Sequence, residues 1–181
     1  MTAAGPHIDL KALIRDVRDF PRPGVLFRDI TPLLLDPDAY RYVVDELTRL
    51  ITGLSPDAIV GIESRGFLFG APVAYNLGVP FVPVRKAGKL PGERMSVEFA
   101  LEYGESQLDI HADALERGRR VVIVDDLLAT GGTAAAAGKL VELLGAYVIA
   151  MAFLVELAFL GGRERLRDYE LIALVRYDNL T

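Results

Sequence analysis

Two adjacent aspartates, Asp125 and Asp126, stand at the end of an apolar run in the segment V-V-I-V-D-D-L-L-A-T-G-G-T, residues 121–133. The four β-branched residues before them are typical of a strand that is buried on both faces of a parallel sheet. The end of such a strand is where open α/β sheets bind their ligands. Carboxylate oxygens there could accept hydrogen bonds from sugar hydroxyls or bind a metal ion.

A glycine-rich turn follows the two acids, because residues 130–133 read T-G-G-T. The alanine-rich segment after it, Thr133 to Leu144, is expected to form a helix. A glycine turn at a helix N-terminus binds anions through its free N–H groups and the helix dipole. Acids beside an anion site suggest a sugar phosphate as the ligand. The simpler alternative is a buried strand that ends in solvated acids and a tight turn.

Two more strand ends carry polar residues. A short apolar strand, Ala58 to Ile62, runs into E-S-R-G before an apolar helix, Phe67 to Leu77. Arg65 in this loop could grip a phosphate with both guanidinium nitrogens, or it could form a structural salt bridge. Another strand, Phe81 to Val84, ends in a cluster of cations that could be solvated or could face the same sheet edge. The cations are Arg85, Lys86, Lys89 and Arg94.

Strands and helices alternate along most of the chain. Asp36 and Pro37 have the residue types of an N-cap and a first helical position, and apolar residues follow at helical spacing. Further apolar strands are expected at Val148 to Val155 and Glu170 to Val175. This alternation predicts one α/β domain with a mostly parallel central sheet and helices on both faces. The helical stripe after Pro37 is Val43, Leu47, Leu50, Ile51 and Leu54.

Two segments do not fit this alternation. Ile8 to Val17 has a rough helical stripe, and Asp19 to Pro32 contains three prolines and a glycine that exclude a regular helix. The second of these is a strap that covers the core or contacts a ligand. Met95 to Leu101 and Gln107 to His111 predict a β-hairpin arm, which is a candidate lid that could exclude water during transfer chemistry.

Composition excludes several classes of function. The 181 residues contain no cysteine, so disulfides and thiolate metal sites are absent, and two histidines are too few for a zinc cluster. A net charge of −5 argues against non-specific nucleic-acid binding. No apolar run is long enough for a membrane span and no signal-peptide pattern is present, so we expect a cytoplasmic protein. Neither a dinucleotide fingerprint nor a P-loop occurs.

Residues 121–133 resemble the phosphoribosyl-pyrophosphate motif of the type I phosphoribosyltransferases. Five further segments extend the resemblance, now to the adenine phosphoribosyltransferases, over nearly the whole chain. The resemblance implies purine salvage, in which adenine and phosphoribosyl pyrophosphate give AMP and pyrophosphate, with Mg²⁺ and usually a homodimer. The segments are F-P-R-P-G-V-L-F-R-D-I-T-P (20–32), E-S-R-G-F (63–67), R-K-A-G-K-L-P-G (85–92), A-L-E-Y-G (100–104) and V-E-L-A-F-L-G-G-R-E (155–164).

The same resemblance implies a type I phosphoribosyltransferase fold in which residues 1–181 form a single domain. The strap, at about 19–32, would be a hood over the base site, and a flexible β lid would span about 90–108. It leaves two alternatives: transfer to another purine such as hypoxanthine or xanthine, and a non-catalytic sensor of phosphoribosyl pyrophosphate. Sensors of this fold usually carry a DNA-binding domain, and about twenty residues before the strap are too few for one.

The resemblance assigns the phosphoribosyl and pyrophosphate contacts. Asp125 and Asp126 would hold the ribose 2′- and 3′-hydroxyls, and Mg²⁺ would be held mainly through the substrate and not by direct protein ligands. The loop that wraps the 5′-phosphate would be Ala129, Thr130, Gly131, Gly132 and Thr133. The pyrophosphate contacts would be Ser64, Arg65, Arg85, Lys86 and Lys89.

The base site and the lid are assigned in the same way. Main-chain groups around Arg28 would read the edge of adenine, and Leu26, where relatives often have valine, would line the ring. Phe27 belongs to the same segment, but its ring could face the base or the core. Glu102, followed by Tyr103 in the lid, would move a proton to or from the base, although Glu98 and Glu105 are rivals by composition. Leu157 would cover the other face of the base.

Overall fold

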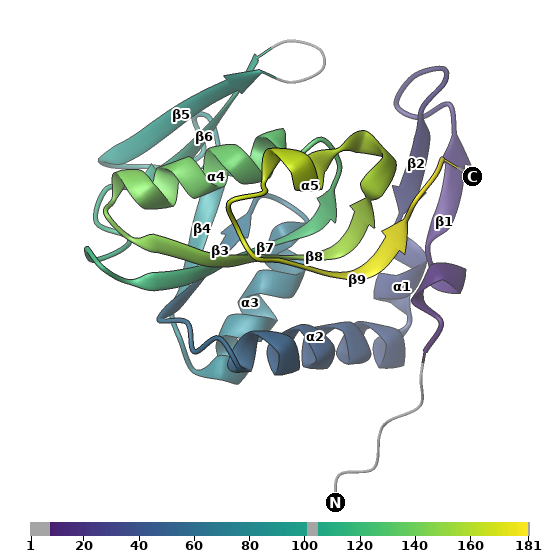
Figure 1. Ribbon diagram of the computed structural model, residues 1–181, viewed down its shortest axis with the longest axis horizontal. Coiled ribbons are helices and arrows are strands. Elements are labelled where there is room, and N and C mark those ends of the chain that lie inside the picture. Colours follow the sequence, from purple (N-terminus) through teal and green to yellow (C-terminus); the bar gives the residue numbers. More distant parts are fainter. Residues whose placement is uncertain (1–7, 101–104, 181) are drawn as a thin grey trace, which may run out of the picture.

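The computed structural model describes residues 8–100 and 105–180, which form a layered α/β structure (Figure 1). Within these residues, one seven-stranded sheet has the strand order β5-β6-β4-β3-β7-β8-β9. Strands β4, β3, β7, β8 and β9 run parallel to one another. Strand β6 runs antiparallel to both of its neighbours, β4 and β5. The predicted α/β class and mostly parallel sheet are therefore confirmed. The parallel strands are β3 (Ala58–Ile62), β4 (Phe81–Lys86), β7 (Arg120–Leu128), β8 (Tyr147–Leu157) and β9 (Leu171–Tyr177).

Helices cover both faces of this sheet, as the strand–helix alternation predicted. Figure 1 shows α2 and α3 on one face and α4 on the other, with α5 beside α4. Each face buries its own apolar cluster: one includes Leu47 of α2 and Phe69 of α3, and the other includes Leu140 of α4. The helical segments are η1 (Leu10–Leu13), α1 (Thr31–Leu35), α2 (Pro37–Thr52), α3 (Gly66–Leu77), α4 (Gly132–Leu143), η2 (Ala158–Leu160) and α5 (Gly162–Arg165).

Helix α2 begins where the sequence predicted. The carboxylate of Asp36 accepts hydrogen bonds from the backbone N–H groups of Asp38 and Ala39 at 3.0 and 3.1 Å, and Pro37 occupies the first turn. These bonds satisfy two of the N–H groups that a helix start leaves free. The predicted apolar stripe faces the core: Val43, Leu47 and Ile51 are fully buried, and Leu50 and Leu54 are half-buried.

The N-terminal segment differs from the expectation. Instead of a helix over residues 8–17, a short 3₁₀ turn, η1, is followed by strand β1 (Arg15–Arg18). Strand β1 pairs antiparallel with β2 (Leu26–Asp29), so the strap that we expected to be irregular contains a strand. The helical stripe was misleading because Leu10 in the turn and Ile14 between the turn and β1 are buried without a helix. This hairpin, the hood, lies beyond the carboxyl ends of β8 and β9 (Figure 1).

The predicted β-hairpin arm is confirmed. Strands β5 (Arg94–Ala100) and β6 (Glu105–His111) pair antiparallel from Arg94–His111 to Ala100–Glu105. Strand β6 also pairs with β4, so the arm is an extension of the main sheet, and in Figure 1 it projects from one edge. The two residues that the sequence assigned to its tip, Glu102 and Tyr103, lie outside the described residues.

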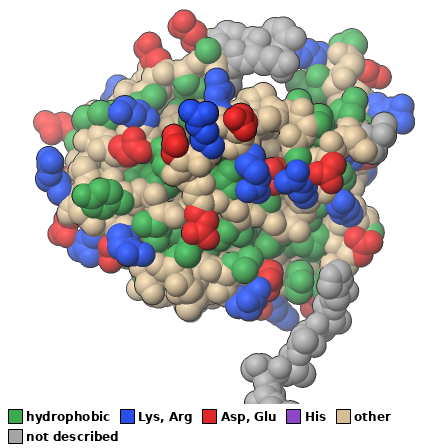
Figure 2. All heavy atoms as spheres, in the orientation of Figure 1, with side chains coloured by type: hydrophobic (Ala, Val, Ile, Leu, Met, Phe, Trp, Pro, Cys, Tyr) green, Lys and Arg blue, Asp and Glu red, His purple; other side chains and the backbone are tan. Residues whose placement is uncertain are grey.

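The surface carries charges of both signs. On the face in Figure 2, basic and acidic side chains are interspersed among the described residues, with apolar side chains between them. No helix in the described part of the chain has the length and hydropathy needed to cross a bilayer.

Candidate active site

Three strand ends meet at one edge of the sheet. Strand β3 lies between β4 and β7, with Gly61 opposite Val124, so the loop after β3 adjoins the two acids, which lie near the end of β7, before Leu128. A Cβ on Gly66 would lie 2.8 Å from Asp125 Oδ1 and 2.9 Å from the carbonyl oxygen of Val124. Only glycine permits this approach. The E-S-R-G loop and the acid pair, which are separated by about sixty residues in sequence, are therefore in contact.

The glycine turn after β7 encloses a small cavity. The cavity has a volume of about 80 Å³ and opens beside Asp125. Gly131 has φ +79°, a left-handed conformation that turns the chain into α4, which begins at Gly132. Free N–H groups at the first turn of a twelve-residue helix make this cavity suited to an anion. It is lined by Asp125, Leu127, Leu128 and residues 129–134.

The two acids have different surroundings. Asp126 is 5% exposed, and its backbone N–H donates to Asp125 Oδ1 at 2.9 Å. Burial and the neighbouring charge of Asp126 raise the pKa of Asp125 well above its ordinary value. Burial also raises the pKa of Asp126, although the positive charge of Arg65 opposes that shift. Adjacent buried carboxylates resist double ionisation, so hydroxyl donors or a cation would be bound favourably here.

Arg65 connects the acids to the hood. Its Nε lies 2.9 Å from Asp126 Oδ2, and its guanidinium carbon lies 5.2 Å from the centre of the Phe27 ring. The salt bridge considered from the sequence therefore forms, on a side chain that is still one-third exposed. Phe27 packs edge-on against Phe20 with ring centres 5.1 Å apart. Its ring thus faces Arg65 and the hood and does not belong to the main core.

The basic cluster is organised by a residue that the sequence reasoning missed, Glu63. Its carboxylate accepts hydrogen bonds from Arg85 Nε at 3.0 Å, Lys89 Nζ at 2.9 Å and the backbone N–H of Lys86 at 2.9 Å. Burial alone would raise the pKa of Glu63, but these hydrogen bonds lower it to about 2. The cations therefore lie at the same edge as Arg65, and Ser64 is exposed in the same loop as Arg65. The position of Glu63 inside E-S-R-G was the available signal.

The hood is fastened by the side chain of Arg28, which contacts β1, the end of β9 and the residues after it. Arg28 is 5% exposed, forms an ion pair with Asp16, donates to the carbonyl oxygen of Leu180 at 2.8 Å and lies 4.0 Å from the centre of the Tyr177 ring. With its side chain anchored, only the main chain of Arg28 is available to a ligand. Leu26 is half-buried in the same strand, and Leu157 is buried at the end of β8.

The arm reaches the glycine turn. A Cβ on Gly132 would lie 3.7 Å from the carbonyl oxygen of Ala100 and 3.8 Å from the ring of Phe99. The last described residue of β5 is therefore beside the anion cavity. In sequence, Glu102 and Tyr103 follow it directly, but both are outside the described residues.

Comparison with known proteins identifies the family. The model for the phosphoribosyl transferase domain family matches residues 40–174. The chain is 58% identical to adenine phosphoribosyltransferase from a Synechococcus species, over 94% of this chain and all of the relative. The chain belongs to the adenine phosphoribosyltransferase family. A crystal structure of the enzyme from Thermoanaerobacter pseudethanolicus superposes with a TM-score of 0.91 at 54% identity, covering 93% of this chain and 98% of that one.

A second relative carries ligands. The structure of adenine phosphoribosyltransferase from Saccharomyces cerevisiae, in complex with adenine and an imino-altritol bisphosphate, has a TM-score of 0.86 at 44% identity and covers 92% of this chain and 96% of that one. The type I phosphoribosyltransferase fold expected from the sequence is thus confirmed. Geometry alone shows acids, cations and an anion cavity at the edge formed by β3, β4 and β7. Membership of the adenine phosphoribosyltransferase family indicates the reaction for which this edge is used.

Proposed function

We propose that this chain transfers the 5-phosphoribosyl group from phosphoribosyl pyrophosphate to adenine, releasing pyrophosphate and giving AMP for purine salvage. The observation that carries the proposal is the acid pair beside an anion cavity at the start of α4, in a member of the adenine phosphoribosyltransferase family. The acids supply acceptors for hydroxyls, and the helix start supplies donors for a phosphate.

The 5-phosphoribosyl group would lie across the end of β7. Main-chain N–H groups of residues 129–133 and the hydroxyls of Thr130 and Thr133 would hold the 5′-phosphate. Asp125 and Asp126 would accept hydrogen bonds from the ribose 2′- and 3′-hydroxyls. Their negative charge would also favour the cationic ribose that develops at C1′ as the bond to pyrophosphate breaks.

Pyrophosphate would leave toward the cations at the ends of β3 and β4. Ser64 and Arg65 lie in the loop after β3. Glu63 holds the side chains of Arg85 and Lys89 and the backbone N–H of Lys86 beside that loop. The family implies Mg²⁺, held mainly through the substrate. The two acids fit such an ion nearby, because Mg²⁺ sites commonly combine substrate phosphates with one or two carboxylates and Asp126 Oδ2 has only its ion pair with Arg65. Bound Mg²⁺ would neutralise charge on the leaving group.

Adenine would bind between the hood and the end of β8. The main chain of Arg28 would read the base edge, while Leu26 and Leu157 would contact opposite faces of the ring. This arrangement suits a flat, apolar ring with a few polar groups at its rim. Phe27 would contribute by supporting Arg65 through the contact between its ring and the guanidinium group.

The arm would act as a lid, with Glu102 as the group that moves a proton to or from the imidazole ring of adenine and Tyr103 beside it. The contact of Ala100 with the glycine turn supports this role, because a closing arm would exclude water from C1′. We expect Glu102→Gln to lower turnover at least ~10-fold while changing AMP affinity much less. Rapid-mix kinetics and calorimetry measure the two; equal losses in both would contradict proton transfer.

A single acceptor experiment tests the activity. Purified protein is incubated with phosphoribosyl pyrophosphate, Mg²⁺ and radiolabelled adenine, hypoxanthine or xanthine, and nucleotide formation and pyrophosphate release are both measured. We expect transfer to adenine with little to the other two bases. Transfer to another base alone would assign a different purine, and binding of phosphoribosyl pyrophosphate without transfer would indicate a sensor.

We further propose that residues 1–181 act as one catalytic domain, as a homodimer in the cytoplasm, in line with the family resemblance. Sedimentation velocity of the full chain tests the dimer, and a monomeric species with full activity would contradict it.

A further inference from the structure

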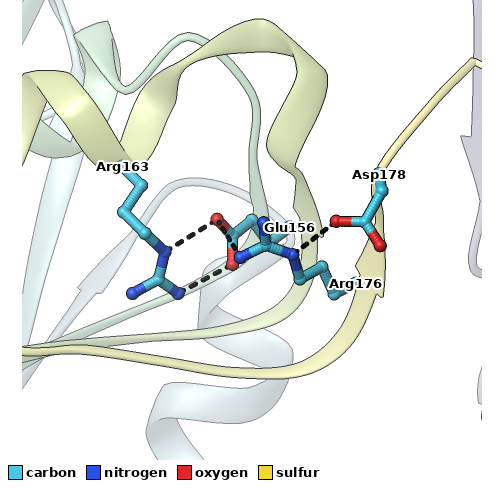
Figure 3. A network of polar contacts seen from close by, with 4 residues as sticks. All are labelled: Glu156, Arg163, Arg176 and Asp178. Atoms are coloured by element: carbon cyan, nitrogen blue, oxygen red, sulfur yellow. Dashed lines mark hydrogen bonds and ion pairs between the residues drawn. The ribbon is translucent and has the colours of Figure 1, made fainter.

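Glu156 is a buried carboxylate to which the proposed reaction gives no role. It lies at the end of β8 and is 1% exposed. Arg163 donates two hydrogen bonds to it, from Nε at 2.9 Å and from the terminal guanidinium nitrogen at 2.7 Å (Figure 3). Arg176 approaches it to 3.7 Å and also binds the exposed Asp178 at 2.7 Å. The hydrogen bonds from Arg163 lower the pKa of Glu156 despite its burial, so it is charged.

On one side, this carboxylate holds a turn that contacts residues 129–133, the proposed 5′-phosphate site, called the phosphate loop from here on. Arg163 directly follows Gly162, and a Cβ on Gly162 would lie only 2.2 Å from the carbonyl oxygen of Ala129. A Cβ on Gly131 would likewise lie 2.9 Å from the carbonyl oxygen of Gly162. The two glycine turns are thus in direct backbone contact. Because Arg163 is clamped to Glu156, the position of its turn, and of the phosphate loop against it, depends on this ion pair.

On the other side, the same carboxylate adjoins the base site. Leu157, the proposed cover for adenine, is the next residue in the chain. Arg176 in β9 lies directly opposite Glu156. The next residue, Tyr177, contacts Arg28 of the hood, whose guanidinium carbon lies 4.0 Å from the centre of the Tyr177 ring. Through β9, Glu156 is therefore connected to the hood strand. The contacts of Glu156 thus lead both to the phosphate loop and to the hood.

We propose that Glu156 is a positioning residue that fixes the phosphate loop relative to the adenine site, so that ribose phosphate and base are held at the separation the reaction requires. This inference rests on the proposed function of the site. We call the phosphate loop and the adenine site the two half-sites. A bond between C1′ and the base can form only if the half-sites hold ribose and base at the correct distance and angle, and small displacements of such groups lower the rate strongly.

Stability alone is a weak explanation for the pair. Taking the carboxylate of Glu156 out of water costs free energy, which its ion pair with the partly exposed Arg163 offsets, and apolar replacements of buried ion pairs are often equally stable. The fork of Arg163 fixes orientation as well as distance, because both nitrogens bind the same carboxylate. A role in fixing the position of the turn at Arg163 accounts for both the burial of Glu156 and the two-pronged contact with Arg163.

The test compares AMP, which spans both half-sites, with ribose 5-phosphate and adenine, which each occupy one. In Glu156→Gln we expect AMP affinity, measured by calorimetry, to fall ~10-fold more than the combined losses for the two half-ligands. We also expect kcat to fall more than KM rises. The matched control is Asp178→Asn, which removes the exposed carboxylate of the same network and should leave all affinities unchanged.

A second variant guards against misfolding. Arg163→Lys keeps the positive charge but loses the bidentate fork, so it should give the same excess loss of AMP affinity to a smaller degree. Loss of AMP affinity that merely equals the combined half-ligand losses, or an equal effect of Asp178→Asn, would overturn the proposal.

The assignment of adenine and the positioning role of Glu156 are tested on different proteins, the first on the wild type and the second on the variants. Should the wild-type protein choose hypoxanthine or xanthine, the assignment of adenine fails, and that base and its nucleotide replace adenine and AMP in the comparison. Failure of the positioning role appears only in the variants.

Discussion

Gly162→Ala is the substitution whose consequence follows most directly from the backbone geometry. The new Cβ would lie 2.2 Å from the carbonyl oxygen of Ala129 and 2.8 Å from a methyl carbon of Leu128. Real Cβ atoms essentially never approach closer than 3.0 Å, so the two glycine turns must move apart by about 0.8 Å or more. Because Ala129 begins the phosphate loop, the displacement is transmitted to the proposed 5′-phosphate site.

The size of the effect follows from this displacement. A misplacement of about 1 Å in a positioning element can lower a rate ~100-fold, so we expect kcat/KM of Gly162→Ala to fall ~10- to 100-fold. Overpacking of this kind also costs about 1–3 kcal/mol of the free energy of unfolding. Ribose 5-phosphate should bind more weakly, since its phosphate contacts the displaced loop.

The neighbouring glycine provides the control. Gly161 has φ +70°, and a Cβ there would meet no atom within 4 Å. Gly161→Ala should therefore lose about 1–2 kcal/mol through backbone strain without moving the phosphate loop. Steady-state kinetics, calorimetry with ribose 5-phosphate and urea unfolding are measured on both variants. If Gly162→Ala retained wild-type kinetics, or if both variants lost activity equally, the inferred coupling between the two turns would be refuted.

Three further predictions address single side chains. Asp126→Asn should lower kcat/KM at least ~10-fold, or ~1.4 kcal/mol of transition-state stabilisation, and unchanged kinetics would rule out a ribose contact. Glu63 has a pKa of about 2, below its ordinary 4.5, so its stabilisation is present above pH 4.5 and is lost as the pH falls toward 2. The difference in Tm between wild type and Glu63→Gln should accordingly shrink over that range, and a constant difference would contradict the ion-pair role. Asp36→Ala should cost ~1 kcal/mol in urea unfolding with kinetics unaltered, and no loss would mean that the cap is not needed.

The sequence predicted the regular parts of the fold well, because their signals are local. The cap at Asp36, the strand Ala58–Ile62 and the glycine turn before α4 each depend on residues that are close in the chain. The segment Ile8 to Val17 was interpreted wrongly as a helix, because β1 forms only through pairing with β2. That pairing is a tertiary interaction, and the period of a short apolar pattern does not reveal it.

The candidate site shows the same division. The sequence identified Asp125, Asp126 and the glycine turn, and the sheet topology brings the E-S-R-G loop and the basic cluster to the same edge. The sequence did not reveal that Glu63 and Glu156 are carboxylates that bind several basic groups. Both are acids whose partners lie elsewhere in the chain, and an unpaired acid and a buried, paired acid look alike in sequence. Their roles depend on burial and on hydrogen-bond partners.

Arg65 shows how the proposed site manages its own charge before substrate binds. Two adjacent buried carboxylates resist carrying two negative charges, and Arg65 reduces that cost at Asp126 by lying 2.9 Å away. In the proposed reaction the same guanidinium group is needed by pyrophosphate. If Arg65 turns toward the leaving group, the charge it leaves at Asp126 must be compensated by other donors. In the proposed binding mode, the ribose hydroxyls would do this when they arrive on the same molecule as the pyrophosphate. We therefore expect the ion pair between Arg65 and Asp126 to favour the complete substrate over either fragment, since a fragment that recruits Arg65 alone would leave the buried carboxylate of Asp126 without a partner.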